Sequence, residues 1–172
     1  MKRGCIVGGG SAIAQGVIRH YLRQGWEVVA LCRESSPFDV DPSERLKVAW
    51  EWEDVTGDYD LVVTLTGSVM NRKLEDLTYD GWNEVMASTL GTVCEALSGL
   101  AFKIKDGGNV VVVGSIVGST GGYGCANYAA AKAGLVGLVR SAALEWVERN
   151  VCVNLLELGY CNCLPGINST HQ

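Results

Sequence analysis

Short β-rich runs alternate with helical stretches along most of this chain, and this alternation restricts its fold more than any other feature. The β-rich runs are Cys5–Val7, Glu27–Cys32, Leu46–Glu53, Leu61–Thr66, Val110–Val113 and Val151–Leu158. Helical periodicity marks Ser11–Gln24, Trp82–Phe102 and Ala126–Glu148. Strands that alternate with helices predict a parallel sheet, and continuous valine runs are typical of strands covered on both faces. The sequence therefore predicts an α/β fold with a parallel sheet of about six strands.

Length and composition fit one folded domain over residues 1–172. The chain is 48% apolar and 19% charged, which excludes low-hydrophobicity disorder. Its net charge is 14 − 19 = −5, so no basic surface predicts binding to nucleic acid or an anionic membrane. No apolar run approaches the ~18 residues of a membrane-spanning helix. We expect neither nucleic acid nor membrane as a partner.

Cysteine usage indicates a reducing compartment. The seven cysteines are an odd number, and several lie in apolar strand-like runs, which favours reduced thiols in the cytoplasm. Cys161 and Cys163 with His171 could ligate a metal, but their spacing matches no usual zinc pattern. We therefore expect a cytoplasmic protein without a metal site.

A glycine run separates the first predicted strand from the first predicted helix. The stretch from Gly8 to Ala14 reads Gly-Gly-Gly-Ser-Ala-Ile-Ala. Glycines at such a turn let the backbone approach a diphosphate, and the helix N-terminus adds N–H groups and a positive dipole. A tight strand-to-helix turn could use the same glycines, but the position favours a dinucleotide site.

Three further residues form a candidate chemical site. Tyr128 and Lys132 are four residues apart and share one face of the last predicted helix. A nearby ammonium favours the phenolate and lowers a tyrosine pKa from about 10, which would make Tyr128 a general acid for a carbonyl oxygen. Ser115 ends a buried strand, where α/β sheets place ligand-binding groups.

Together these motifs resemble the short-chain dehydrogenase/reductase family along nearly the whole chain. The family's T-G-x-x-x-G-x-G loop corresponds to Val7–Ala14, its acidic-valine strand end to Asp54-Val55, and its N-N-A-G stretch to Thr64–Gly67. The resemblance implies a Rossmann-like, doubly wound sheet that binds a nicotinamide dinucleotide. The cofactor-binding residues it implies are Gly8, Gly10, Ser11, Ala12, Ile13, Arg33, Asp54, Val55, Thr66, Gly67, Tyr128 and Lys132.

The same resemblance assigns catalytic roles. Ser115 lies thirteen residues before Tyr128, at the family's spacing. Tyr128 would transfer the proton, Lys132 would hold the nicotinamide ribose and depress the tyrosine pKa, and Ser115 would hydrogen-bond the substrate oxygen. The family's fourth catalytic residue is an asparagine, and Ser88 or Thr89 stands in its place.

Two other departures concern the fold. Only seven residues, Asp54–Asp60, connect the third and fourth predicted strands, so the helix usual at this crossover is expected to be absent. The family also continues beyond the strand that ends near Leu158, into a substrate lobe that this sequence lacks. We expect the Tyr160–Gln172 tail to be turn or coil, and the catalytic face to be open and poorly selective.

Cofactor preference depends on the end of the second predicted strand. An acidic residue there would favour NAD, but Cys32 and Arg33 occupy the position. Arginine can pair with a 2′-phosphate through two hydrogen bonds, which favours NADP over NAD. Alternatively, Arg33 is a solvated loop residue and Glu34 binds the ribose.

Two main hypotheses for function follow. The first is an NADP-dependent oxidoreductase that interconverts a small-molecule carbonyl and an alcohol through Ser115, Tyr128 and Lys132. The second is a non-catalytic dinucleotide-binding sensor or scaffold, favoured by the missing asparagine and lobe; a truncated reductase is a third possibility.

We also expect a homodimer through helices 82–102 and 126–148, because both carry few charges around their circumference.

Overall fold

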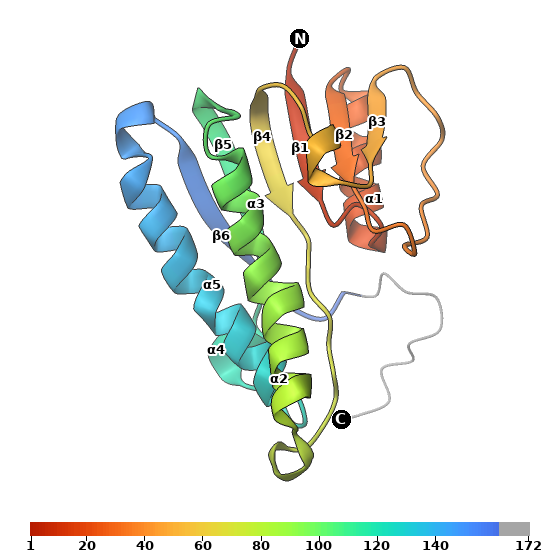
Figure 1. Cartoon of the computed structure of the whole chain (residues 1–172). Coiled ribbons are helices and arrows are strands. Elements are labelled where there is room, and N and C mark those ends of the chain that lie inside the picture. The colour runs from red at the N-terminus through yellow and green to blue at the C-terminus, as the bar shows by residue number, and fades with distance from the viewer. Residues whose placement is uncertain (162–172) are drawn as a thin grey trace.

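A computed structural model of the protein describes residues 1–161. One sheet of six strands runs in the order β3-β2-β1-β4-β5-β6, and every neighbouring pair is parallel (Figure 1). This arrangement confirms the predicted α/β class. The strands are β1 (Arg3–Val7), β2 (Glu27–Leu31), β3 (Leu46–Ala49), β4 (Tyr59–Thr64), β5 (Ile104–Ser115) and β6 (Cys152–Leu158).

Helices cover both faces of the sheet (Figure 1). On one face lies α1 (Ala12–Arg23), and on the other lie α2 (Tyr79–Met86), a π-helical turn η3 (Ala87–Gly91), α3 (Thr92–Leu100) and α5 (Ala126–Glu145). Short elements complete the fold: η1 (Trp52–Asp54), η2 (Leu74–Asp76), α4 (Val117–Thr120) and η4 (Val147–Arg149). No helix among residues 1–161 is long and apolar enough to cross a membrane.

Alternation along the strands divides the core into two layers. In β1, Cys5 and Val7 pack toward α3 and α5, whereas Ile6 packs toward α1 with Ile18. All four side chains are at most 2% exposed. Because successive strand residues point to opposite faces, a short apolar strand with both faces covered has no polar position.

Several predicted boundaries shift in the structure. The third strand ends at Ala49 rather than Glu53, because Trp52–Asp54 forms a 3-10 helix. The fifth strand starts at Ile104 rather than at Val110, and its pairing with β4 is irregular between Ile104 and Asn109. The predicted helix 82–102 starts at Tyr79, because the Thr78 hydroxyl caps it, and is interrupted by the π-helical turn.

The remaining differences lie near the carboxyl end. The glycine-rich stretch 114–124 contains the short helix α4, and the last long helix ends at Glu145. The connection between β3 and β4 contains only η1, which agrees with the expected lack of a full crossover helix. Trp52 packs against the core there.

An apolar groove runs beside α1, on the face of the sheet that α1 covers. It has a volume of about 420 Å³ and is lined by Val17 and Tyr21 of α1 and by the sheet residues Val63, Val113 and Leu156. Leu156 is 51% exposed. Among the described residues, this part of the sheet face therefore has less cover than the part over β1 and β2.

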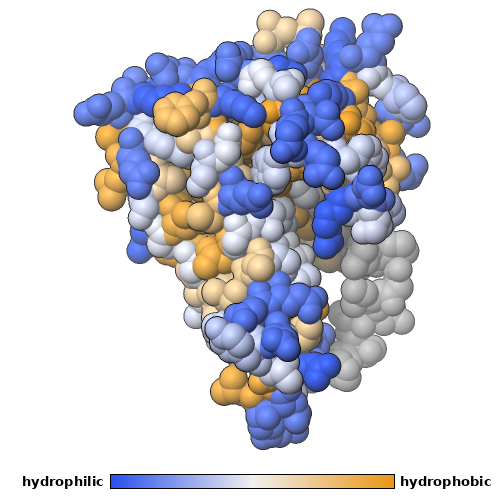
Figure 2. Space-filling model, viewed as in Figure 1, coloured by the Kyte–Doolittle hydropathy of each residue, from blue (hydrophilic) through white to orange (hydrophobic). Residues whose placement is uncertain are grey.

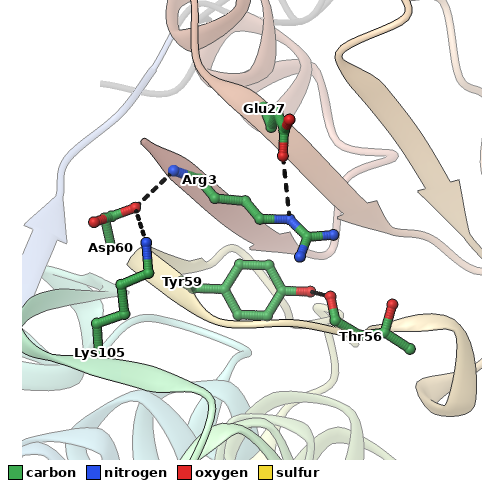
Figure 3. Close-up of polar contacts among 6 residues, drawn as sticks. All are labelled: Arg3, Glu27, Thr56, Tyr59, Asp60 and Lys105. Atoms are coloured by element: carbon green, nitrogen blue, oxygen red, sulfur yellow. Dashed lines mark hydrogen bonds and ion pairs between the residues drawn. The ribbon is translucent and has the colours of Figure 1, made fainter. Parts of the chain in front are cut away.

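A polar cluster joins the amino ends of four strands (Figure 3). The Arg3 backbone N–H donates to Asp60 Oδ2 at 2.8 Å, and Lys105 Nζ donates to the same oxygen at 2.9 Å. The Arg3 guanidinium lies over the Tyr59 ring and 3.8 Å from Glu27 Oε2. These contacts connect β1, β2, β4 and β5 at the end of the sheet opposite the glycine run.

Candidate active site

The glycine run makes the tight turn that connects β1 to α1. Gly8 has φ +85°, and a Cβ at this position would lie 2.5 Å from the Leu65 carbonyl oxygen. Glycine is therefore required here both by the backbone conformation and by the close approach of the next strand. The amides of Gly8 and Gly9 donate to the Leu31 carbonyl at 3.0 Å, and the Ser11 hydroxyl caps α1 by accepting from Ala14 N at 3.1 Å.

A cleft of about 510 Å³ opens at the carboxyl ends of β1, β2 and β4. The chain reverses its direction across the sheet between β1 and β4, and open α/β sheets bind ligands at such a switch point. The volume lies within the range of small-molecule and cofactor sites. The lining residues that sequence analysis predicted are Gly8, Gly10, Ser11, Arg33, Thr66, Gly67 and Ser88.

Six predicted cofactor residues lie outside the cleft lining; Tyr128 and Lys132 are described below, and the other four lie on α1 and in or after η1. Ala12 and Ile13 begin α1 outside the cleft lining, and Ile13 faces the apolar groove. Asp54 ends η1, where it lies 4.0 Å from Lys47 Nζ, and Val55 is fully buried. Because the strand stops at Ala49, the wall that Asp54 and Val55 were expected to form is instead formed by Trp50, Glu51 and Trp52.

Lys132 is the central polar group of the site. Its side chain projects from α5 and is almost fully buried. Its Nζ donates to the Thr66 carbonyl at 3.1 Å and to the Val113 carbonyl at 2.9 Å. Burial lowers the Lys132 pKa to about 8, because the charged ammonium loses its hydration. The ammonium thus joins the carboxyl ends of β4 and β5.

Tyr128 lies one helical turn before Lys132. The ammonium is 5.6 Å from the centroid of the half-buried ring. Burial raises the pKa of the phenol, and the Ser115 side chain opposes this rise by hydrogen bonding. The prediction that Lys132 lowers the Tyr128 pKa is wrong for this structure, because the ammonium is directed to two backbone carbonyls and desolvation has the larger effect.

Ser115 is the last residue of β5 and lies beside Tyr128. Its Oγ accepts a hydrogen bond from Val117 N at 3.3 Å. The start of α5 is fixed by buried Asn127, which donates to the Gly81 carbonyl at 3.3 Å and accepts from Tyr128 N at 2.8 Å. The structure therefore brings Ser115, Tyr128 and Lys132 to one end of the sheet.

The π-helical turn carries both candidates for the fourth position. Thr89 is fully buried, and its hydroxyl has no hydrogen-bond partner within the described part of the chain. A Cβ on Gly67 would lie 3.1 Å from Thr89 Oγ1 and 3.6 Å from Lys132 Nζ. Ser88 instead faces the cleft, with its Oγ 2.6 Å from Ser68 Oγ. Thr89 is thus the candidate nearer to Lys132, and Ser88 the candidate nearer to the cleft.

Comparison with known proteins identifies the family. The model for "short chain dehydrogenase" matches residues 36–169. The chain belongs to the short-chain dehydrogenase family. It is 35% identical over 123 residues to the 3-oxoacyl-(acyl-carrier-protein) reductase of Salmonella typhimurium, covering 70% of this chain and 50% of the relative. It is 30% identical over 106 residues to an acetoacetyl-CoA reductase of Acinetobacter, covering 60% and 43%.

A solved short-chain dehydrogenase from Francisella tularensis has the same fold. It superposes with a TM-score of 0.83 at 18% identity, and the match covers 93% of this chain and 70% of that structure. The chain spans about half the length of the curated short-chain dehydrogenases that it matches.

Sequence reasoning missed several residues of this short-chain dehydrogenase site. Trp50 and Trp52 were assigned to the predicted strand Leu46–Glu53, but they line the cleft. Gln15 gave no signal in the sequence, although it joins two loops at the cleft. No cluster among residues 1–161 could hold a metal ion, and Cys163 and His171 lie outside the described residues, as does most of the predicted tail.

Proposed function

We propose that this short-chain dehydrogenase is an NADP(H)-dependent oxidoreductase that interconverts a carbonyl and an alcohol. The observation that carries the proposal is the position of Lys132. Its buried ammonium is held by the Thr66 carbonyl, which belongs to a residue lining the dinucleotide-sized cleft, and lies one helical turn from Tyr128. Tyr128 and Ser115 supply a hydroxyl pair at the same end of the sheet.

Different side chains of this protein transfer the proton and orient the substrate carbonyl. Tyr128 donates its phenolic proton to the carbonyl oxygen during reduction and accepts a proton in the reverse direction. The Ser115 hydroxyl donates a hydrogen bond to the same oxygen, where negative charge develops. NADPH supplies the hydride when bound. Lys132 would hold the nicotinamide ribose, and a pKa of about 8 leaves its ammonium largely protonated at neutral pH.

The residues that line the cleft support the binding of a nicotinamide dinucleotide. Its glycine wall, Gly8 and Gly10, precedes the N-terminus of α1, where unpaired N–H groups favour a diphosphate. The exposed Arg33 side chain also lines the cleft, after β2. A guanidinium there can bind a 2′-phosphate through paired hydrogen bonds, which supports NADP over NAD.

The test is reduction of a 3-oxoacyl thioester, because the relatives include a 3-oxoacyl-(acyl-carrier-protein) reductase and an acetoacetyl-CoA reductase. We expect NADPH oxidation with acetoacetyl-CoA, and we expect Tyr128→Phe to reduce the rate by about a hundredfold or more while NADPH still binds. The substitution keeps the ring and removes only the hydroxyl. An unchanged rate in the variant would exclude Tyr128 as the acid.

One observation supports the non-catalytic alternative. The cleft lining does not include Ser115, Tyr128 or Lys132, and burial raises the Tyr128 pKa in this state. A dinucleotide-binding sensor would bind NADPH in a titration but would show no turnover with any carbonyl substrate. The NADPH titration and the turnover assay together therefore distinguish the enzyme from the sensor.

We further propose a homodimer in the cytoplasm. The outer face of α3 and α5 carries scattered apolar side chains (Figure 2), and Phe102, Leu144 and Val147 are more than half exposed on or beside these helices. Ala133 and Gly137 are also exposed along α5 and would allow close helix contact. The six described cysteines are free thiols, as expected in a reducing compartment.

A further inference from the structure

Gln15 is a buried polar residue of α1 whose side chain binds only backbone groups of two loops. It is 8% exposed. Its Nε2 donates to the Gly10 carbonyl at 3.1 Å and to the Pro37 carbonyl at 3.0 Å, and its Oε1 accepts from Asp39 N at 3.1 Å. One side chain amide thus joins the glycine run to the segment that follows β2.

Both loops form walls of the cofactor cleft, although Gln15 itself does not line it. Gly10 contributes to one wall, and Arg33, Ser36 and Pro37 contribute to the other. The two walls are in contact, because a Cβ added to Gly10 would clash with the Cβ of Ser36. A shift of the second loop would therefore change the width of the cleft at this end.

Besides Gln15, the second loop is held by Phe38 and Val40, which pack against the core, and by the Arg19 guanidinium, which donates to the Asp39 carbonyl. Residues 32–45 contain no helix or strand, so their fixed conformation depends on contacts with the rest of the protein. Arg19 and Asp39 form an exposed ion pair at 3.7 Å, and such pairs contribute little stability. The hydrogen bonds of Gln15 are partly buried, and their loss would leave three backbone groups without these partners.

We propose that Gln15 is a positioning residue for the adenosine end of NADP. By fixing the 33–39 loop against the glycine run, it places Arg33 and Ser36 where a 2′-phosphate enters the cleft. This role rests on the proposed dinucleotide binding but is separate from the catalysis by Tyr128. Gln15 thereby affects the ratio of the dissociation constants for NADPH and NADH, in addition to any effect on the stability of the fold.

The experiment compares Gln15→Met with Gln24→Met, a matched control at the exposed C-terminal end of the same helix. Titrations with NADPH and with NADH are made well below the melting temperature of each variant. We expect Gln15→Met to weaken NADPH binding about tenfold and NADH binding less, so that the ratio of the two dissociation constants falls. Gln24→Met should leave both constants within about twofold of the parent.

A merely structural role would lower the melting temperature of Gln15→Met and leave that ratio unchanged, and this result would overturn the proposal. If the variant does not fold, hydrogen exchange in the parent decides. The Asp39 amide should be protected without cofactor and more protected with NADPH, whereas rapid exchange in both states would overturn the proposal. A parent chain that binds neither dinucleotide would instead refute the proposed function, and the positioning role with it.

Discussion

Arg33 and Lys132 show how differently two basic residues can be used in one site. Arg33 is exposed on the wall of the cleft and remains free to pair with a ligand, whereas Lys132 is buried and held by two backbone carbonyls. The i, i+4 spacing of Tyr128 and Lys132 could be predicted from the sequence. The direction of the Tyr128 pKa shift could not, because it depends on burial, which only the folded chain defines.

Arg33→Ala should narrow the preference for NADPH over NADH by about tenfold, because the variant loses a charged partner for the 2′-phosphate. Fluorescence titration with both cofactors measures this change. Arg23→Ala, at the exposed end of α1, is the control and should leave the preference unchanged. A parent protein with equal affinities for both cofactors would contradict the prediction.

Lys132 should make the stability of the fold depend on pH in the alkaline range. Its folded pKa of about 8 lies below its ordinary value of 10.5, so the unfolded chain binds the extra proton between these limits. Stability therefore rises as the pH increases from about 8 to about 10.5, by up to about 3 kcal/mol, because burying the charge is costly only below this range. Urea unfolding of the parent and of Lys132→Met across this range tests the sign. A constant difference in unfolding free energy between the two proteins would contradict it.

At the scale of secondary structure, pattern and spacing predicted which elements exist better than where they end. The alternation of Leu46–Glu53 indicated one long strand, but the chain turns after Ala49 into a 3-10 helix that packs Trp52 on the core. The π-helical turn between α2 and α3 was also invisible, because helical periodicity does not distinguish one extra residue per turn. That turn is nevertheless what carries Ser88 to the cleft and Thr89 toward Gly67 and Lys132.

A substitution of Asp60 tests how β1, β4 and β5 are held together at their amino ends (Figure 3). Burial alone would raise the Asp60 pKa, but hydrogen bonds from Lys105 and from the Arg3 amide lower it overall. A carboxylate with a depressed folded pKa stabilises the fold above its unfolded pKa of about 3.9, and this contribution is lost as the pH falls through the folded value. Asp60→Asn should cost about 1–2 kcal/mol at pH 7 and little in acid. Asp58→Asn, on the exposed side, is the control for denaturant unfolding, and equal losses in both variants would refute the role of Asp60.

For the whole molecule, the order of strands and helices was predictable because each element carries its own periodic pattern. The cleft wall was harder to predict, since it joins segments that are distant in the sequence. Trp50, Arg33 and Thr66 meet there through the topology of the sheet, and no local pattern marks their proximity. The paired Ser115 and Tyr128 were found because the family's motif spacing already encodes this topology.

The outer face of α5 should form the contact between two copies of the chain. Gly137→Glu places a charge on the exposed face of α5, where a Cβ meets nothing within 4 Å, and should convert the dimer into a monomer. Gly16→Glu on α1 has the same open space on the other side of the sheet and should leave the dimer intact. Light scattering at micromolar concentration measures both. A parent that is already monomeric would refute the proposed dimer.

The apolar groove beside α1 has a practical consequence for measuring this protein. Dyes that fluoresce on apolar surface should bind Val63, Val113 and Leu156 while the chain is still folded. A dye-based melting curve would then start from a high signal, which is easily mistaken for the loosely packed state of a molten globule. Near-ultraviolet circular dichroism separates the two, because the buried Tyr59 and the packed Trp52 keep fixed surroundings only in the native fold.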